Sequence, residues 1–126
     1  MYTLEIKDES FAGAVINKIL LQFESEHITV EELIKARIEM EIKRYEKDAE
    51  SYKEGLVLPA YLEKKTKKSN KNIDLEKQLY IALKSFQENG FFILVDDEQV
   101  ESLDQKVYVD ESVHISFIKL TPLVGG

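Results

Sequence analysis

The first residues of the chain alternate between apolar and polar side chains. Tyr2, Leu4 and Ile6 stand at every second position, which is the period of a strand with one buried face. A second apolar run covers residues 15–23. Gly13 precedes this run, at the place where a hairpin turn favours a residue without a Cβ. The pattern therefore predicts an opening β-hairpin.

A helical pattern follows the hairpin. Thr29 and Glu32 form a T-x-x-E capping box, in which each side chain can satisfy a free backbone N–H at the start of a helix. Apolar residues then recur at spacings of three and four, which is typical of one buried helix face: Val30, Leu33, Ile34, Ile38 and Ile42. We expect a helix from about Val30 to the neighbourhood of Ala49.

A second helix is predicted after a weakly patterned stretch. Residues 51–72 contain the breakers Gly55 and Pro59 and end in a run of lysines. Asp74 is a candidate N-cap, and Asn89-Gly90 is a typical C-terminal signal. The apolar side of this helix comprises Leu75, Leu79, Ala82, Leu83 and Phe86.

Strands return in the last third of the chain. Phe91–Val95 is a continuous apolar run before the acidic turn 96–98, which favours a strand that is covered on both faces. Val107 and Val109 alternate with polar neighbours. In the last run, residues 113–120, one side carries Val113, Ile115, Phe117 and Lys119. This order of elements predicts an α+β roll in which a helix covers one face of a sheet.

Length and composition narrow the class of protein. A chain of 126 residues predicts a single domain over residues 1–126. The absence of cysteine excludes disulfides, thiolate metal sites and thiol nucleophiles. The net charge of −7 argues against a general nucleic-acid binder, because such binding depends on neutralising phosphates. No apolar stretch is long enough for a bilayer, and residues 1–10 do not resemble a signal peptide, so we expect a cytoplasmic protein without membrane contact.

Catalytic and metal-binding motifs are scarce. The chain has no glycine-rich phosphate loop, no G-x-S-x-G and no H-E-x-x-H. The histidines, His27 and His114, have no spacing that indicates a catalytic triad. The acidic residues 96–98 lack the spacing of a calcium loop and are interpreted as a solvated turn. We therefore expect no enzymatic activity, no resident cofactor and no metal site.

The end of the sequence carries the strongest functional signal. Gly125-Gly126 follows the last predicted strand and Pro122. We expect residues 121–126 to form a flexible tail with a carboxylate at its tip. Glycine lets the backbone approach another protein closely, so such a tail can enter a narrow channel and present its carboxylate to the α-phosphate of ATP.

These residues also carry a resemblance to a known family. Residues 29–38 resemble the start of the ubiquitin helix, and residues 113–120 before Gly125-Gly126 resemble its final strand and tail. Residues 117–126 are similar to the tail of the sulfur-carrier proteins of thiamine and molybdopterin synthesis. The resemblance implies a β-grasp fold, in which a mixed sheet of four or five strands wraps one long helix. Residues 51–90, with the second helix, would be an insertion, since both families have a short connection there.

The resemblance also implies a function as a protein modifier of the bacterial ubiquitin-like type. An activating enzyme, using ATP and magnesium, would adenylate the carboxylate of Gly126 and pass it through enzyme thioesters to a target protein. A conjugating enzyme and a deconjugating protease would be further partners. The tail residues that would contact the activating enzyme are Leu120, Pro122, Leu123 and Val124, and the lysines that could accept a second copy are Lys64, Lys65, Lys67, Lys68 and Lys71.

Two other interpretations remain open. In a sulfur carrier, the terminal carboxylate would become a thiocarboxylate. A non-covalent interaction or immunity protein would make no use of the two glycines. The lysine run itself is interpreted as a solvated linker rather than as an RNA-binding or acid-binding segment.

Overall fold

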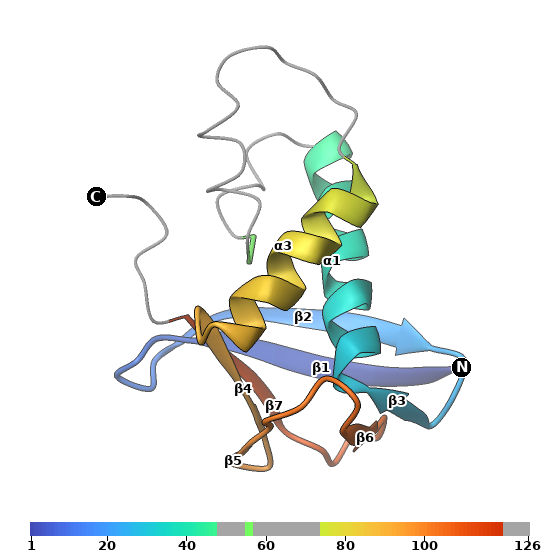
Figure 1. The fold of residues 1–126 in the computed structure, drawn as a ribbon. Helices are drawn as coiled ribbons and strands as arrows, with labels where there is room; N and C mark the ends of the chain where they lie inside the picture. Colours follow the sequence, from blue (N-terminus) through green and yellow to red (C-terminus); the bar gives the residue numbers. More distant parts are fainter. Residues whose placement is uncertain (48–54, 57–73, 120–126) are drawn as a thin grey trace.

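The computed structural model describes residues 1–47, 55–56 and 74–119. The fold is α+β: a mixed five-stranded sheet forms one layer, and two helices lie over one of its faces (Figure 1). The elements are β1 (Tyr2–Glu9), β2 (Val15–Phe23), β3 (His27–Thr29), α1 (Val30–Lys47), α3 (Leu75–Gln87), β4 (Phe91–Val95), β5 (Glu98–Gln99), β6 (Lys106–Tyr108) and β7 (Ile115–Lys119).

The strand order of the main sheet is β2-β1-β7-β4-β5. The central pair, β1 and β7, is parallel, with Ile6 opposite Ile115. All other neighbouring pairs in this sheet are antiparallel. The first and last strands of the described chain therefore lie side by side in the middle of the sheet.

The predicted opening hairpin is confirmed. Leu4 pairs with Leu21 and Ile6 with Ile19, and all four side chains are buried. Gly13 has φ +93°, a conformation that L side chains rarely adopt, and its N–H donates to the Ser10 carbonyl over 2.9 Å.

A small two-stranded sheet, β3 with β6, was not predicted as such. His27 pairs with Tyr108 and Thr29 with Lys106. The pattern of Val107 and Val109 indicated the second of these strands, and both valines are buried. The first strand was missed because its three residues are too few to show an alternation.

Helix α1 begins as the sequence predicts. The Thr29 N–H donates to Glu32 Oε1 over 2.9 Å, and the Glu32 N–H donates to Thr29 Oγ1 over 3.1 Å, which completes the capping box. All five residues of the predicted apolar stripe, from Val30 to Ile42, are buried. The helix is described to Lys47, so its predicted end near Ala49 lies outside the described residues.

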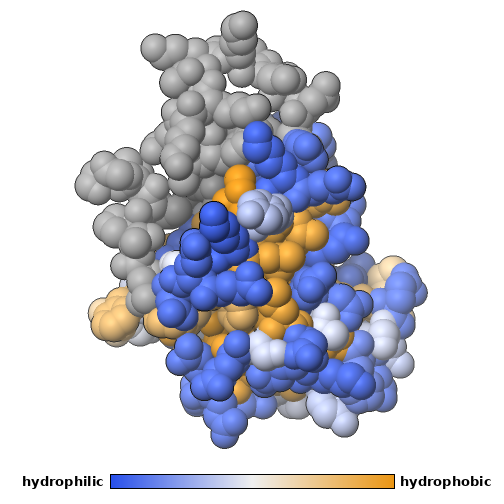
Figure 2. Space-filling view, in the orientation of Figure 1, coloured by the Kyte–Doolittle hydropathy of each residue, from blue (hydrophilic) through white to orange (hydrophobic). Residues whose placement is uncertain are grey.

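The second predicted helix, α3, is also confirmed. Asp74 is its N-cap and accepts the Lys77 N–H over 3.3 Å. At the other end, Asn89 has φ +62° and the Gly90 N–H donates to the Ser85 carbonyl over 2.7 Å. Ala82 and Phe86 are buried, and Leu75, Leu79 and Leu83 pack half-buried against the core. Figure 2 shows hydrophobic residues over this helix layer, bordered by hydrophilic ones.

One expectation about β4 is wrong. Phe91 and Ile93 are buried toward the helices, whereas Phe92 and Leu94 alternate with them and are only half-buried. The continuous apolar run predicted a strand covered on both faces, but both described helices lie on the same face of the sheet (Figure 1). None of the helices in the described ranges is long and apolar enough to cross a membrane.

Candidate functional site

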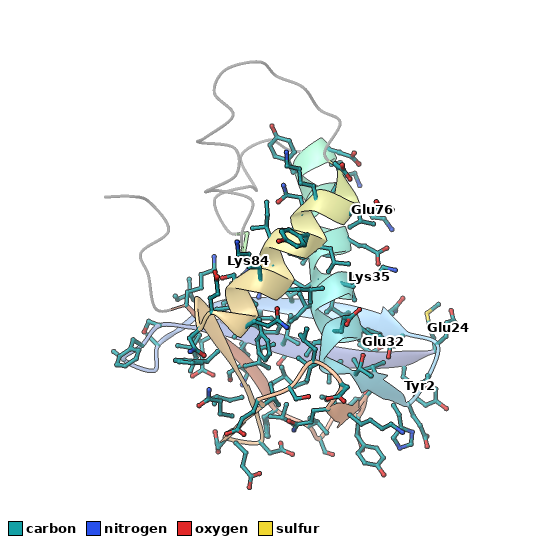
Figure 3. All side chains as sticks on the ribbon, in the orientation of Figure 1. Tyr2, Glu24, Glu32, Lys35, Glu76 and Lys84 are labelled. Carbon is teal, nitrogen blue, oxygen red and sulfur yellow. The ribbon has the colours of Figure 1, made fainter. Side chains whose placement is uncertain are left out.

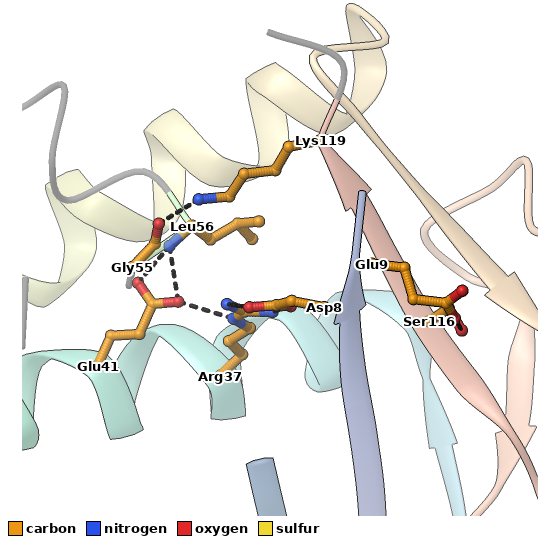
Figure 4. Close-up of polar contacts among 8 residues, drawn as sticks. All are labelled: Asp8, Glu9, Arg37, Glu41, Gly55, Leu56, Ser116 and Lys119. Carbon is orange, nitrogen blue, oxygen red and sulfur yellow. Dashed lines mark hydrogen bonds and ion pairs between the residues drawn. The ribbon is translucent and has the colours of Figure 1, made fainter. Parts of the chain in front are cut away.

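The end of β7 belongs to a cluster of charged side chains that are buried or, at Lys119, half-buried. The cluster, called the polar cluster below, consists of Asp8, Arg37, Glu41 and Lys119 with the backbone of Gly55 and Leu56 (Figure 4). It joins β1, α1, β7 and the short described segment 55–56.

The alternation of side chains along the strands and their spacing along the helix explain why these residues meet. Asp8 continues the inward alternation of Leu4 and Ile6 in β1. Arg37 and Glu41 lie on the buried side of α1, because they follow Leu33 at spacings of four and eight residues. Lys119 follows Phe117 on the inward side of β7.

Arg37 is the centre of the cluster. Its side chain is fully buried, and Nη2 donates to Asp8 Oδ2 over 2.7 Å while Nη1 donates to Asp8 Oδ1. Nε donates to Glu41 Oε2 over 2.7 Å. The guanidinium carbon lies 4.9 Å from the centre of the Phe117 ring. Burial lowers the pKa of Arg37, but the hydrogen bond to Asp8 and the charges of Glu41 and Asp8 raise it above its ordinary value.

Glu41 fixes the segment 55–56. The Leu56 N–H lies 2.9 Å from Glu41 Oε1 and 2.8 Å from Oε2, and the Leu56 side chain is buried. Burial raises the pKa of the Glu41 carboxyl, and the charge of Arg37 and the Leu56 N–H only partly offset this effect. The carboxylate thus holds a backbone group that is fifteen residues away in sequence.

Lys119 closes the cluster from the side of the sheet. Its ammonium group donates to the Gly55 carbonyl. Burial, together with the nearby positive charge of Arg37, lowers the pKa of Lys119 to about 8 against the opposing effect of Glu41 and Asp8. The last residue of β7 is therefore attached both to the sheet and to the segment 55–56.

The contacts of the polar cluster hold separate parts of the chain together. Two carboxylates face two cations, so the group is balanced in charge, and its hydrogen bonds join four parts of the chain. Among residues 1–47, 55–56 and 74–119, no group of three histidines or acidic residues is placed to hold a metal ion. On the opposite face of the same strands, Ser116 donates to Glu9 (Figure 4).

The structure places some of the residues that the sequence singled out. His27 is exposed, with its ring centre 4.4 Å from that of Tyr108, and His114 is exposed just before β7. In the acidic turn, Asp96 accepts the backbone N–H of His114 over 2.9 Å, and Asp96 and Asp97 have positive φ, so the turn is confirmed. Glu98 was assigned to the turn but belongs to β5.

The residues predicted to react or to be recognised lie outside the described residues. This is the case for the tail residues Leu120, Pro122, Leu123, Val124, Gly125 and Gly126. It also holds for the candidate acceptors Lys64, Lys65, Lys67, Lys68 and Lys71. The structure describes the chain as far as Lys119, the last residue of β7.

Comparison with known proteins identified no relative of this chain. Neither the protein-family models, nor the curated proteins, nor the solved structures gave a match to this chain. The functional interpretation therefore depends on the chain's own residues and topology.

Proposed function

We propose that the chain is a ubiquitin-like protein modifier with a β-grasp fold, activated at the carboxylate of Gly126. The strand order β2-β1-β7-β4-β5, the parallel central pair and the helix α1 across one face are compatible with this fold. In this proposal α3 belongs to an insertion between α1 and β4. The Thr29–Glu32 capping box, which is part of the resemblance to the ubiquitin helix, is formed.

The observation that carries the proposal is the position of β7. This strand lies in the middle of the sheet between β1 and β4, and it ends at Lys119, seven residues before Gly126 in the sequence. Seven extended residues span at most about 25 Å. An anchored strand followed by a segment of this length can present a carboxylate inside a partner enzyme while the domain remains folded.

The polar cluster supports the proposal because it strengthens the anchor. Lys119 is bonded to Gly55, and its neighbour Phe117 packs against Arg37. A partner that pulls on the tail would therefore act on a strand that is fixed by its hydrogen bonds to two neighbours and by the cluster below it.

The proposed chemistry needs no catalytic group from this chain. A carboxylate oxygen of Gly126 attacks the α-phosphorus of ATP, and pyrophosphate leaves. A cysteine thiolate of the activating enzyme then attacks the acyl carbon, and AMP leaves. Finally an amine of the target displaces the thiolate to form an amide. The chain has no cysteine, so each thiolate in this series of reactions must come from a partner.

In vitro activation tests the proposal. The protein, a candidate activating enzyme from the source genome, ATP and magnesium should give pyrophosphate and an enzyme thioester that a reducing agent cleaves. Deletion of Gly125 and Gly126 should abolish both products and leave the melting temperature unchanged. Gly126→Ala should lower the rate less, because a methyl group narrows the fit but leaves the carboxylate. Normal activation of the truncated chain would contradict the proposal.

The sulfur carrier is the alternative outcome of the same chemistry. If the activated carboxylate receives sulfur, the intact protein becomes about 16 Da heavier, since sulfur replaces one oxygen. A thiocarboxylate in protein purified from the native source, without any conjugate, would favour the carrier over the modifier.

A further inference from the structure

A pocket of about 600 Å³ lies at the C-terminal end of α3. Its walls come from four parts of the chain: the end of α3 with the turn that follows it, the start of β4, the segment 99–104 and the first turn of α1 (Figure 1). This volume is within the usual range of ligand pockets. None of the residues of the polar cluster lines the pocket, so it is a separate site.

Apolar side chains form part of the wall of the pocket. Phe86 and Phe91 are 8% and 2% exposed, and their ring centres are 5.9 Å apart. Phe92 and Leu103 also line the pocket and are half-buried. The pocket therefore offers apolar surface to the hydrocarbon part of a ligand.

Backbone hydrogen bonds fix the segment 99–104 to its surroundings. The Val100 N–H donates to the Ile93 carbonyl over 3.0 Å, and the Glu31 N–H donates to the Leu103 carbonyl over 2.9 Å. The segment is thus attached both to β4 and to the start of α1. Because the wall is already ordered, a ligand loses little affinity to the ordering of this segment.

The charged side chains of the pocket are all acidic. Glu31, Glu101 and Asp104 line it and are exposed, and no described lysine or arginine lines it. Within the described ranges, none of these three carboxylates forms an ion pair. They are also not grouped closely enough to hold one metal ion. The complement of this lining is a cation whose charge is spread over several donor atoms.

We propose that the pocket binds the side chain of an arginine from a partner protein. A guanidinium group has five N–H donors in one plane and can reach separate acceptors, whereas an ammonium group is a compact point charge. The carboxylates and the amide oxygens of Gln87 and Gln99 accept these donors. The hydrocarbon stem of the arginine covers Phe92 and Leu103. The proposal does not depend on the chemistry of Gly126.

Helix α3 makes this pocket a feature of the chain instead of the general fold. Phe86 and Gln87 of α3 and Asn89 of the following turn form one side of it. The resemblance described above implies only a short connection in place of residues 51–90. The inserted helix would therefore supply a recognition site that a β-grasp domain without it lacks.

A blocked peptide tests the proposal directly. The probe is Ser-Leu-Arg-Leu-Ser with both ends blocked, and in two controls lysine or citrulline, which is a neutral analogue of the same shape, replaces the arginine. The arginine peptide should shift the backbone amide signals of residues 99–104 of ¹⁵N-labelled protein in a saturable manner. The lysine peptide should bind at least about threefold more weakly, and the citrulline peptide at least about tenfold. Added salt should weaken only the two charged peptides.

Charge-neutralising variants locate the contact. Glu31→Gln/Glu101→Gln should weaken the arginine peptide about tenfold or more, because it removes two of the three charges of the pocket. Glu24→Gln/Glu76→Gln makes the same change in charge at two exposed carboxylates outside the pocket (Figure 3), and it should leave the affinity within about threefold. If the pocket variant fails to fold, the three peptides still give the comparison on the wild-type protein.

Four results would overturn the proposal. The first is the absence of saturable shifts in residues 99–104 at millimolar arginine peptide. The second is equal affinity for the arginine and citrulline peptides, and the third is an equal loss of affinity in the pocket variant and its control. The fourth is binding of spermine to residues 99–104 while the arginine peptide does not bind, since the pocket would then serve a small polyamine.

Discussion

Arg37 Nη2 donates to Asp8 Oδ2 over 2.7 Å inside the protein, so that a buried ion pair joins helix α1 to strand β1. The same guanidinium donates to Glu41, which in turn holds the Leu56 N–H. A buried ion pair is weak evidence for net stability, because both charges have been removed from water. Breaking it is costly, however, since the remaining charge stays buried without its partner.

Asp8→Asn should therefore destabilise the protein strongly. The substitution keeps the shape of the side chain but leaves the Arg37 charge without its main partner, which costs about 3 kcal/mol. Glu5→Gln is the matched control, since Glu5 is exposed on the outer face of the same strand, and it should change the free energy of unfolding by less than about 0.5 kcal/mol. Urea unfolding curves measure both values. Equal effects of the two variants would show that the pair does not act as described.

Glu41→Gln should loosen the segment 55–56. A glutamine amide has one acceptor oxygen instead of two and carries no negative charge, so it holds both Arg37 and the Leu56 N–H more weakly than the carboxylate does. Hydrogen exchange at the Leu56 amide should become at least about tenfold faster, which corresponds to the loss of one hydrogen bond to a charged group. Glu39→Gln, on the same helix but outside the cluster, should leave this exchange rate unchanged. An unchanged rate in Glu41→Gln would mean that another contact holds the segment.

The lowered pKa of Lys119 predicts a specific dependence of stability on pH. The folded protein releases this proton near pH 8, whereas the unfolded chain keeps it up to its ordinary pKa of 10.5. Raising the pH from 8 to 10.5 therefore favours the folded state, and lowering it through 8 removes this contribution. Over this window the wild type should gain up to about 3 kcal/mol relative to Lys119→Met.

The control for this measurement is Lys84→Met, which removes an exposed lysine from α3. Its free energy of unfolding should follow that of the wild type at each pH, because Lys84 is exposed to solvent in both states. If Lys119→Met also follows the wild type from pH 8 to 10.5, the ammonium group is not desolvated in the folded protein.

The sequence predicted the elements better than it predicted the polar cluster. The hairpin around Gly13, the capping box at Thr29 and the N-cap at Asp74 are local signals, and each is confirmed because its chemistry involves neighbouring residues. The coverage of β4 was predicted wrongly. Phe92 and Leu94 are apolar but only half-buried, and the pattern of one strand does not show whether helices cover one face of its sheet or both.

The residues of the polar cluster could have been assigned to the core from the alternation along the strands and the spacing along α1. Asp8 and Lys119 each continue an inward-facing alternation, and Arg37 and Glu41 fall on the apolar stripe of α1. Four charged residues at predicted core positions indicate mutual pairing, since buried charges are paired. The Arg37–Glu41 pair is local, at a spacing of four residues on one helix. The Arg37–Asp8 pair could not be predicted, because it depends on how α1 packs against β1, 29 residues away in sequence.

The central claim, that Gly126 is joined to targets through its carboxylate, is tested most directly by mass spectrometry of proteins from the native source. Trypsin cleaves after Lys119, so each conjugate should carry the remnant Leu-Thr-Pro-Leu-Val-Gly-Gly on an acceptor lysine. Conjugation through Gly126 predicts target peptides with this remnant, and their absence from a strain that encodes the chain without Gly125 and Gly126. A native source that expresses the protein and its neighbouring enzymes but contains only the unconjugated 14.6 kDa chain would contradict the account.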